Sequence, residues 1–299
     1  MDFKAQYQLY LDKINLEIEK EFNTDTLPQQ SVFDAMKYGI TAGGKRIRPV
    51  LLMAVSDLFG GNAEDAAKVA LAVECVHNYS LIHDDLPCMD DDDLRRGRPT
   101  CHMVFEENIA LLAGDGLLNR AFEILSDTGK FIELSTEKLI KIINILSTAS
   151  GAYGMIGGQV IDLESENRTN VVLEELTNLH NRKTGDLIYA SAVCGCICGG
   201  ITDANDINYQ KIVKFSRNLG LAFQIKDDIL DVIGNQDVLG KPVGSDDKSN
   251  KNTFVTLMGL KNAEAELLRL TEDAKARIKD IEGSEFLVSL ADYLLSREY

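Results

Sequence analysis

The sequence predicts an all-α fold, a bundle of ten or more helices. Apolar residues recur at helical spacing along most of the 299 residues, and only five prolines interrupt the chain. No pair of alternating apolar runs predicts a β-hairpin, and strands and helices do not alternate as they do in a doubly wound sheet. The composition shifts nowhere enough to mark a linker, so we expect one domain over residues 1–299.

The expected helices follow one another with short connections. Leu9, Ile14 and Ile18 mark a first helix, and Pro49 stands at the start of a second that ends at Gly60. Residues 64–84 form the strongest helical run, rich in Ala and β-branched core positions. Further helices are expected at residues 104–126, 135–150, 152–165, 172–199, 205–233, 254–259, 262–280 and 284–296.

The run from residue 142 to residue 161 is uncharged but polar. It contains Asn144, Gln159 and four glycines, which favours two buried helices broken at Gly151 or Gly154 over a membrane span. The charged N-terminus lacks the features of a signal peptide. We therefore expect a soluble, cytoplasmic protein with no membrane insertion.

The charge balance limits the possible partners. Forty-seven acidic residues against 31 basic ones give a formal net charge of −16. Nucleic-acid binding requires a basic surface, so no nucleic-acid partner is expected, and adhesion to anionic membranes is disfavoured. A phosphate-bearing ligand would need a local basic cluster or metal ions.

The cysteines favour packing over metal binding. Three of the six, Cys194, Cys196 and Cys198, occupy alternate positions, and no second pair with thiolate–metal spacing exists elsewhere. We interpret them as small core residues of a tightly packed helix, and this number of free thiols suits a reducing compartment.

Two aspartate clusters carry the functional signal. In the first, Asp84 and Asp85 end the 64–84 helix and Asp90 follows, with Pro87 between them. Proline cannot continue a regular helix, so the chain should bulge and bring Asp90 back toward Asp84. Carboxylates gathered in this way call for a cation to neutralise them.

Two arginines follow the first cluster directly, Arg95 and Arg96. The planar guanidinium group binds phosphate oxygens bidentately. A metal-binding cluster followed directly by two arginines is therefore the pattern expected of a site that binds a metal–diphosphate complex. The alternative interpretation is a solvated acidic loop, as most charge runs are.

The second cluster has regular helical spacing. Asp227, Asp228 and Asp231 share one helix face, and Gln224 lies one turn earlier. The alternative interpretation is an ordinary set of surface acids paired with bases such as Lys226.

A glycine-rich basic segment precedes both clusters. It supplies Gly43, Gly44, Lys45, Arg46 and Arg48. Glycine lets the backbone approach a phosphate closely, and the N-terminus of the next helix offers free N–H groups. Alone, this segment could equally be an ordinary basic turn.

Three more features point toward the same site. His77 lies two helical turns before Asp84, although a lone helical histidine is more often a core residue than a ligand. Gly185 interrupts a long helical pattern just after Lys183, where a kink would expose carbonyl dipoles. Lys241 and Lys251 lie in the long polar segment 234–252 and could close over a diphosphate.

These motifs together closely resemble the short-chain trans-polyprenyl diphosphate synthases, most of all the bacterial farnesyl diphosphate synthases. The resemblance covers essentially the whole chain in order and spacing. Its motifs are GGKRIRP at 43–49, HNYSLIHDDLPCMDDDDLRRGRPTCH at 77–102, AGDGLL at 113–118, GGQVIDL at 157–163, KTGDLI at 183–188 and FQIKDDILDVIG at 223–234.

The resemblance implies a homodimeric isoprenoid-synthase bundle around a deep central cavity. It implies condensation of isopentenyl diphosphate with dimethylallyl and then geranyl diphosphate to give all-trans farnesyl diphosphate. In the family, three Mg²⁺ ions bridge the two aspartate motifs and the allylic diphosphate. The departing diphosphate is expected to take the proton, because the nearby carboxylates should bind metal.

The family roles transfer onto matching positions. Asp84, Asp90 and Asp227 are the expected catalytic metal ligands, supported by Asp85, Asp228 and Asp231. Isopentenyl diphosphate would be held by Gly44, Lys45, Arg48, His77 and Arg96. The allylic substrate would be held by Arg95, catalytic Lys183, Thr184, Gln224, Lys241 and Lys251, of which Lys251 stands in a run that departs from the family pattern.

Product length should depend on Tyr79, five residues before Asp84 and about 7.5 Å along the helix axis. Its ring could form the floor of the cavity, and Ser80 beside it is small. In the family, one aromatic here together with the two-residue insertion in the first motif accompanies fifteen-carbon products. The alternative is that Tyr79 is only a core residue.

Three rival functions remain at this stage. A geranylgeranyl or longer-chain synthase would share every motif. A class I terpene cyclase would not need a second diphosphate site, and so would leave the glycine-rich basic segment unexplained. A non-enzymatic acidic metal-binding protein would also leave Arg95 and Arg96 unexplained.

Overall fold

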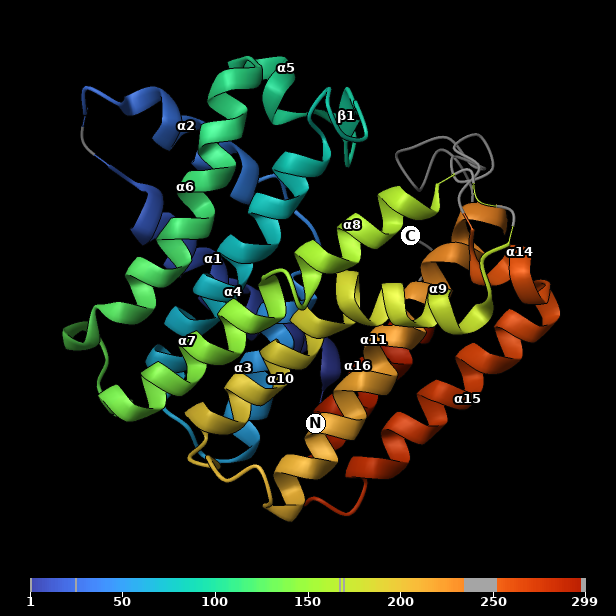
Figure 1. The fold of residues 1–299 in the computed structure, drawn as a ribbon. Helices are drawn as coiled ribbons and strands as arrows, with labels where there is room; N and C mark the ends of the chain where they lie inside the picture. The colour runs from blue at the N-terminus through green and yellow to red at the C-terminus, as the bar shows by residue number, and fades with distance from the viewer. Residues whose placement is uncertain (1, 25, 167, 169, 234–251, 297–299) are drawn as a thin grey trace.

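The computed structural model describes residues 2–24, 26–166, 168, 170–233 and 252–296, and within them the fold is all-α, as predicted (Figure 1). The first half of the chain forms α1 (Phe3–Phe22), α2 (Gln30–Ile40), α3 (Ile47–Leu58), α4 (Ala63–Asp84), α5 (Cys101–Phe105), α6 (Glu107–Ser126), the 3₁₀ turn η1 (Thr128–Lys130) and α7 (Thr136–Ser150). The second half forms α8 (Met155–Ser165), α9 (Leu173–His180), the π-helical turn η2 (Asn181–Gly185), α10 (Asp186–Cys198), α11 (Ile207–Ile233), α14 (Phe254–Met258), α15 (Leu260–Ile278) and α16 (Glu285–Ser296).

Helices α3, α4 and α10 run through the middle of the bundle, with α6 and α7 on one side and α11, α15 and α16 on the other (Figure 1). Helix α10 is buried along almost its whole length, including Cys194, Cys196 and Cys198. The interpretation of these cysteines as core residues is therefore confirmed, and all six cysteines of the chain are free thiols.

A second, smaller core lies between α9, α11, α14 and α15. Leu176, Ile225, Phe254 and Leu267 are among its buried residues. This cluster fixes the part of α11 that carries the second aspartate cluster against the segment that follows residue 251.

Several elements differ from the sequence-based expectation. Helix α2 was not predicted, and it has no side-chain hydrogen bond at its N-terminal cap, the signal by which helix starts are usually recognised. A two-residue hairpin, β1 (Leu94–Arg95) and β2 (Arg98–Pro99), was also missed. The expected helix 104–126 is two helices, because Glu106 between them has a left-handed φ of 67°.

The apolar run after residue 136 is divided, as predicted, by a turn at residues 151–154 between α7 and α8. By length and composition, Thr136–Ser165 passes as a candidate membrane span, with 39% of its apolar window buried in the protein. The break and the polar side chains make this weak evidence for a span.

Candidate active site

The first aspartate cluster folds back on itself as the sequence predicts. Helix α4 ends at Asp84, and the backbone N–H of Asp90 donates to the Asp84 carbonyl at 2.9 Å. Asp91 then adopts a left-handed φ of 52°, which turns the chain away from the helix axis. The insertion thus forms a closed loop that returns Asp90 to the end of α4.

The hairpin β1–β2 places the arginines beside this loop. The Arg95 guanidinium donates from Nε to both Asp85 carboxylate oxygens at 2.8 Å, a geometry that fixes both side chains. Arg96 donates instead to the carbonyl of Gly43, so the hairpin also touches the glycine-rich segment. The two adjacent arginines therefore serve different sides of the site.

Asp84 is electrostatically the most perturbed of these acids. Burial raises the pKa of its carboxyl group to about 6, the charges of Asp90 and Asp85 act in the same direction, and Lys183 and Arg95 oppose them. A carboxylate that is desolvated among like charges is stabilised by a cation placed next to it. The influence of Lys183 also shows that the end of α4 lies near η2.

The glycine-rich segment presents fewer bases than its sequence suggests. Arg46 has a left-handed φ of 50°, and its side chain is buried against Glu74, with Nη1 2.6 Å from Oε1. The carbonyl of Lys45 accepts a hydrogen bond from the Tyr7 hydroxyl. Gly44 has a φ of 109°, which strains any residue with a side chain, and a Cβ there would also displace the Arg96 guanidinium, whose Nη1 would be 2.4 Å away.

Arg48 and His77 form the inner end of this basic region. Arg48 Nη1 lies 3.4 Å from His77 Nε2. Burial and the neighbouring arginines hold the pKa of His77 well below its ordinary value, so the imidazole is neutral and can accept from Arg48. Burial lowers the pKa of Arg48 to about 10, while the charges of Glu74 and Asp227 raise it.

A relay of hydrogen bonds organises the second aspartate cluster. The Thr184 hydroxyl donates to Gln224 Oε1 at 3.2 Å, and Gln224 Nε2 donates to Asp228 Oδ1 at 3.0 Å. The other oxygen of Asp228 accepts from the backbone N–H of Phe254 at 2.8 Å. Asp228 is only 3% exposed, so it supports the site from inside the bundle, below the less buried Asp227.

The interruption predicted near Gly185 is the π-helical turn η2. Its Lys183 forms an ion pair of 2.5 Å with Asp162 on α8. A π turn widens the helix and shifts its hydrogen-bond pattern, and such turns are frequent at functional sites. Asp162 was missed by sequence reasoning, although it lies inside the motif GGQVIDL, and Glu74 was missed as well.

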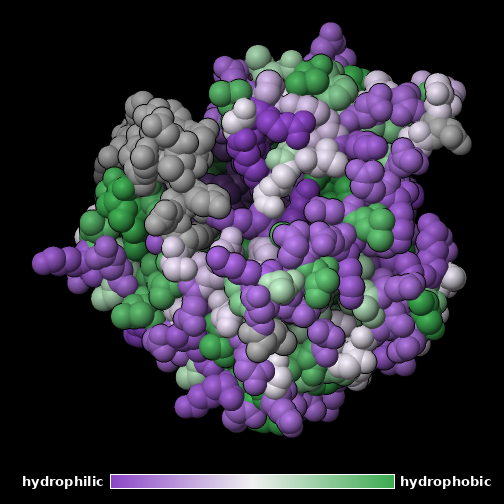
Figure 2. All heavy atoms as spheres, turned by 180° about the vertical axis from the view of Figure 1, so that it is seen from behind, coloured by the Kyte–Doolittle hydropathy of each residue, from purple (hydrophilic) through white to green (hydrophobic). Residues whose placement is uncertain are grey.

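Two electrostatic interactions connect residues of the expected site across α3, α4, η2 and α11. Asp84 of α4 interacts with Lys183 of η2, and Arg48 of α3 interacts with Asp227 of α11. Lys241 and Lys251, also expected at the site, lie outside the described residues. The space-filling view in Figure 2 shows a hollow lined mainly by hydrophilic residues.

The carboxylate groups of both clusters are of the ligand type that hard divalent cations prefer. Mg²⁺ prefers oxygen ligands, and both clusters offer only carboxylate oxygens. Within the described ranges, no three His, Cys, Asp or Glu side chains approach closely enough to hold a metal ion as they stand. The predicted Mg²⁺ ligands therefore remain a prediction.

Tyr79 lies below the first cluster on α4. Its ring is 5% exposed and packs edge-on against His83 at a centroid distance of 5.7 Å. The buried hydroxyl has no hydrogen-bond partner within the described part of the chain. Ser80 uses its hydroxyl to donate to the carbonyl of His77 at 2.9 Å.

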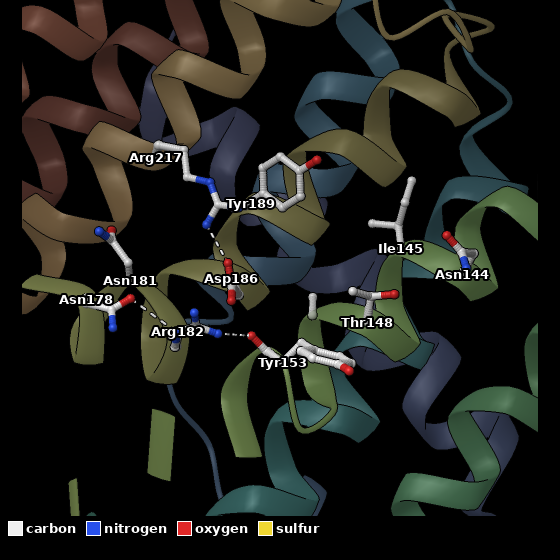
Figure 3. A pocket seen from close by; sticks show the side chains of 11 residues that line it. Asn144, Ile145, Thr148, Tyr153, Asn178, Asn181, Arg182, Asp186, Tyr189 and Arg217 are labelled. Atoms are coloured by element: carbon white, nitrogen blue, oxygen red, sulfur yellow. Dashed lines mark hydrogen bonds and ion pairs between the residues drawn. The ribbon is translucent and has the colours of Figure 1, made fainter. Parts of the chain in front are cut away.

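A separate pocket of about 590 Å³ is lined by residues of α7, η2, α10 and α11 (Figure 3). Both of its arginines are engaged: Arg217 pairs with Asp186 and covers the Tyr189 ring, and Arg182 donates to the carbonyl of Tyr153. None of the predicted site residues lines this pocket. Its wall nevertheless includes Arg182, the residue directly before Lys183.

Comparison with known proteins agrees with the motif-based expectation. The sequence profile of the family described as polyprenyl synthetase matches residues 29–287. The chain is 43% identical to a farnesyl diphosphate synthase of Bacillus subtilis, over 90% of each chain. It is 42% identical to a chloroplastic geranylgeranyl pyrophosphate synthase of Catharanthus roseus, over 89% of this chain and 74% of that one.

A solved structure shares the fold closely. It is a geranyltransferase from Helicobacter pylori complexed with magnesium and isoprenyl diphosphate. The match covers 98% of each chain at 35% identity, with a TM-score of 0.83.

Proposed function

We propose that this chain, which belongs to the polyprenyl synthetase family, is a prenyltransferase that condenses isopentenyl diphosphate with dimethylallyl and then geranyl diphosphate to give all-trans farnesyl diphosphate. One structural observation carries the proposal: both aspartate clusters interact electrostatically with cations of the proposed site. The charge of Lys183 acts on Asp84, and the charge of Asp227 acts on Arg48. A diphosphate on each side of the reacting carbons needs this arrangement of charges.

The allylic diphosphate would lie between the two aspartate clusters. We expect Asp84, Asp90 and Asp227 to bind Mg²⁺, about three ions in all, which would supply the positive charge that neutralises the leaving diphosphate. Asp85 holds Arg95 in place with a bidentate contact, and Asp228 holds Gln224. Asp231, 7% exposed, supports the same face of α11.

The chain's own cations would bind the leaving group from the other side. Asp162 restrains the Lys183 ammonium group at 2.5 Å, so its charge is held in position before substrate binds. The backbone of η2 and the side chain of Gln224 would face the developing allylic cation with carbonyl dipoles. Lys241 and Lys251 are proposed to complete this half of the site.

Isopentenyl diphosphate would bind the basic region at the start of α3. We expect Lys45, Arg48, His77 and Arg96 to hold this diphosphate, and Gly44 to allow close approach of the backbone. Arg48 already lies 3.4 Å from His77. A neutral His77 donates one hydrogen bond and accepts another, which suits a positioning role next to Arg48. The proton released after carbon–carbon bond formation would pass to the departing diphosphate.

A fifteen-carbon product is proposed because Tyr79 fills the space under the first cluster with a buried ring. The similarity to a geranylgeranyl pyrophosphate synthase keeps a twenty-carbon product as the second candidate.

We further propose that the chain is a single domain that acts in the cytoplasm as a homodimer. Helices α5 to α8, and the turn between α7 and α8, expose large apolar side chains that a second copy of the chain would cover. They are Met103, Val104, Leu111, Leu112, Ile140, Tyr153, Ile156, Val160 and Leu163. Light scattering after size exclusion would check the state, and a monomer at micromolar concentration would contradict it.

The decisive experiment is product analysis. The protein is incubated with isopentenyl and dimethylallyl diphosphates and Mg²⁺, and the dephosphorylated products are separated by chromatography. We expect farnesol, and none when isopentenyl diphosphate is omitted. A twenty-carbon alcohol would establish the second candidate, and a cyclic hydrocarbon from geranyl diphosphate alone would contradict both.

A further inference from the structure

A buried acid lies directly beneath the basic region at the start of α3. Glu74 is 2% exposed and sits in the middle of α4, among core residues. Its Oε1 accepts from Arg46 Nη1 at 2.6 Å and from Asn78 Nδ2 at 3.0 Å. A charged carboxylate is placed in a core only where cations compensate for its lost hydration.

One buried acceptor, on Glu74 itself, and one buried donor, on Arg48, form no hydrogen bond in the described structure. Glu74 Oε2 and Arg48 Nε are both buried, and neither has a hydrogen-bond partner among the described residues. They have complementary character, since a carboxylate oxygen accepts and a guanidinium Nε donates. Buried polar atoms rarely remain unpaired, so their complementary character favours pairing of these two groups through a water molecule.

The charge of Glu74 acts on two arginines of the basic region. Among the charges that act on Arg48, Glu74 is the strongest that favours the protonated guanidinium, and it has the same effect on Arg96. Arg46, by contrast, cannot contact a ligand from its buried position, where its other amino group donates to the carbonyl of Ile40. Arg46 therefore fixes Glu74 rather than the substrate.

We infer that Glu74 is a positioning residue for isopentenyl diphosphate: anchored by Arg46 and Asn78, it orients Arg48 toward the diphosphate. The acid acts through Arg48 and does not touch the substrate. This inference rests on the proposed function, because it assigns the basic region to the second diphosphate.

The test compares Glu74→Gln with a matched variant on the same helix. Asp65→Asn also neutralises a buried acid of α4, nine residues from Glu74 and so about 13 Å along the helix axis. The oxygens of Asp65 accept from the backbone N–H groups of Ile132, Glu133 and Leu134. Both variants should lower the melting temperature. Only Glu74→Gln should raise the KM for isopentenyl diphosphate, by about tenfold, while the KM for geranyl diphosphate changes by less than about twofold.

A second variant keeps the inference testable if Glu74→Gln does not fold. Asn78→Leu removes the amide that holds Glu74 Oε1 and leaves every charge in place. It should raise the same KM by about two- to fourfold. If Asn78→Leu or Glu74→Gln raises both substrate KM values equally, or neither of them, the positioning role is wrong.

Equilibrium binding separates this inference from the proposed function. Calorimetric titration of isopentenyl diphosphate into the wild type, Glu74→Gln and Asp65→Asn needs no turnover. Weaker binding by Glu74→Gln alone supports the inference even if the wild type forms no farnesyl diphosphate. Equal affinity in the three proteins, or a wild type that does not bind, contradicts it.

Discussion

Gly158 of α8 lies against the backbone of Lys183, so closely that a Cβ at Gly158 would be 2.3 Å from the Lys183 nitrogen and 2.6 Å from its Cα. This contact packs η2 directly against α8. Gly158 lies four residues before Asp162, which pairs with the Lys183 ammonium group. The position of a charged side chain of the site thus depends on the absence of one methyl group.

Gly158→Ala should therefore impair catalysis more than folding. The added methyl group must push η2 away from α8, and displacement of a reacting group by about 1 Å costs on the order of 100-fold in rate. We expect kcat to fall about 10- to 100-fold, with a loss of about 1–3 kcal/mol in unfolding free energy. Gly129→Ala, whose Cβ would meet only an aspartate oxygen at 3.8 Å, is the control and should retain full activity.

Gln224 connects η2 to the second aspartate cluster through both ends of its amide group. Gln224→Leu removes the acceptor for Thr184 and the donor for Asp228. We expect kcat to fall about tenfold, because a hydrogen bond to a charged group contributes about 1.5–3 kcal/mol. Gln210→Leu, an exposed position on the same helix, should have no effect on steady-state kinetics. Equal activity of both variants would show that the relay has no role.

The protein should lose stability between about pH 6.5 and pH 4, in part through His180. Burial lowers the pKa of His180 to about 4, the charge of Lys183 acts in the same direction, and Asp162 opposes them. Both ring nitrogens are buried without a hydrogen-bond partner in the described structure. The unfolded chain takes up the proton first as pH falls, so the stability present above about pH 6.5 declines by up to about 3 kcal/mol.

Urea unfolding at pH 7.5 and pH 4.5 measures this effect. His180→Phe should show a smaller difference between the two pH values than the wild type. The ring of His180 packs against Phe254 at a centroid distance of 5.5 Å, so Phe254→Leu serves as the control. It should lower stability by a similar amount at both pH values. An unchanged pH difference in His180→Phe would exclude His180 as the titrating group.

Tyr79 should limit product length through its ring and not its hydroxyl. Tyr79→Ala removes the buried ring, so products of twenty carbons or more should appear in the chromatographic assay. Tyr79→Phe should still give fifteen-carbon products, because the hydroxyl has no partner to lose within the described residues. An unchanged product from Tyr79→Ala would leave Tyr79 as a core residue only.

The sequence predicted those features that follow from local rules. Pro87 excludes a continuous helix, so the return of Asp90 to Asp84 could be expected, and Gly185 marked the interruption that became η2. Helix periodicity located α4 and α11 because their buried faces are long.

Other features depend on distant partners that one sequence does not reveal. Arg46 and Arg48 have the same side chain two residues apart, yet only Arg46 forms an ion pair with Glu74. That difference requires a left-handed backbone at Arg46 and an acid 28 residues away. The pairing of Lys183 with Asp162 likewise joins two helices whose packing no local pattern encodes. Helix α2 was missed because its first turn has no capping side chain.

The distribution of the cysteines allows chemical modification of the native protein at a single position. Cys88, inside the first aspartate cluster, is the one exposed thiol of the six, while burial raises the pKa of Cys101 and Cys198 to about 12. A thiol reagent should therefore modify the native protein once, and the other five sites only when helices open. The rate of that single reaction should fall when ligands occupy the cluster, so the wild-type chain needs no engineered label to follow substrate binding.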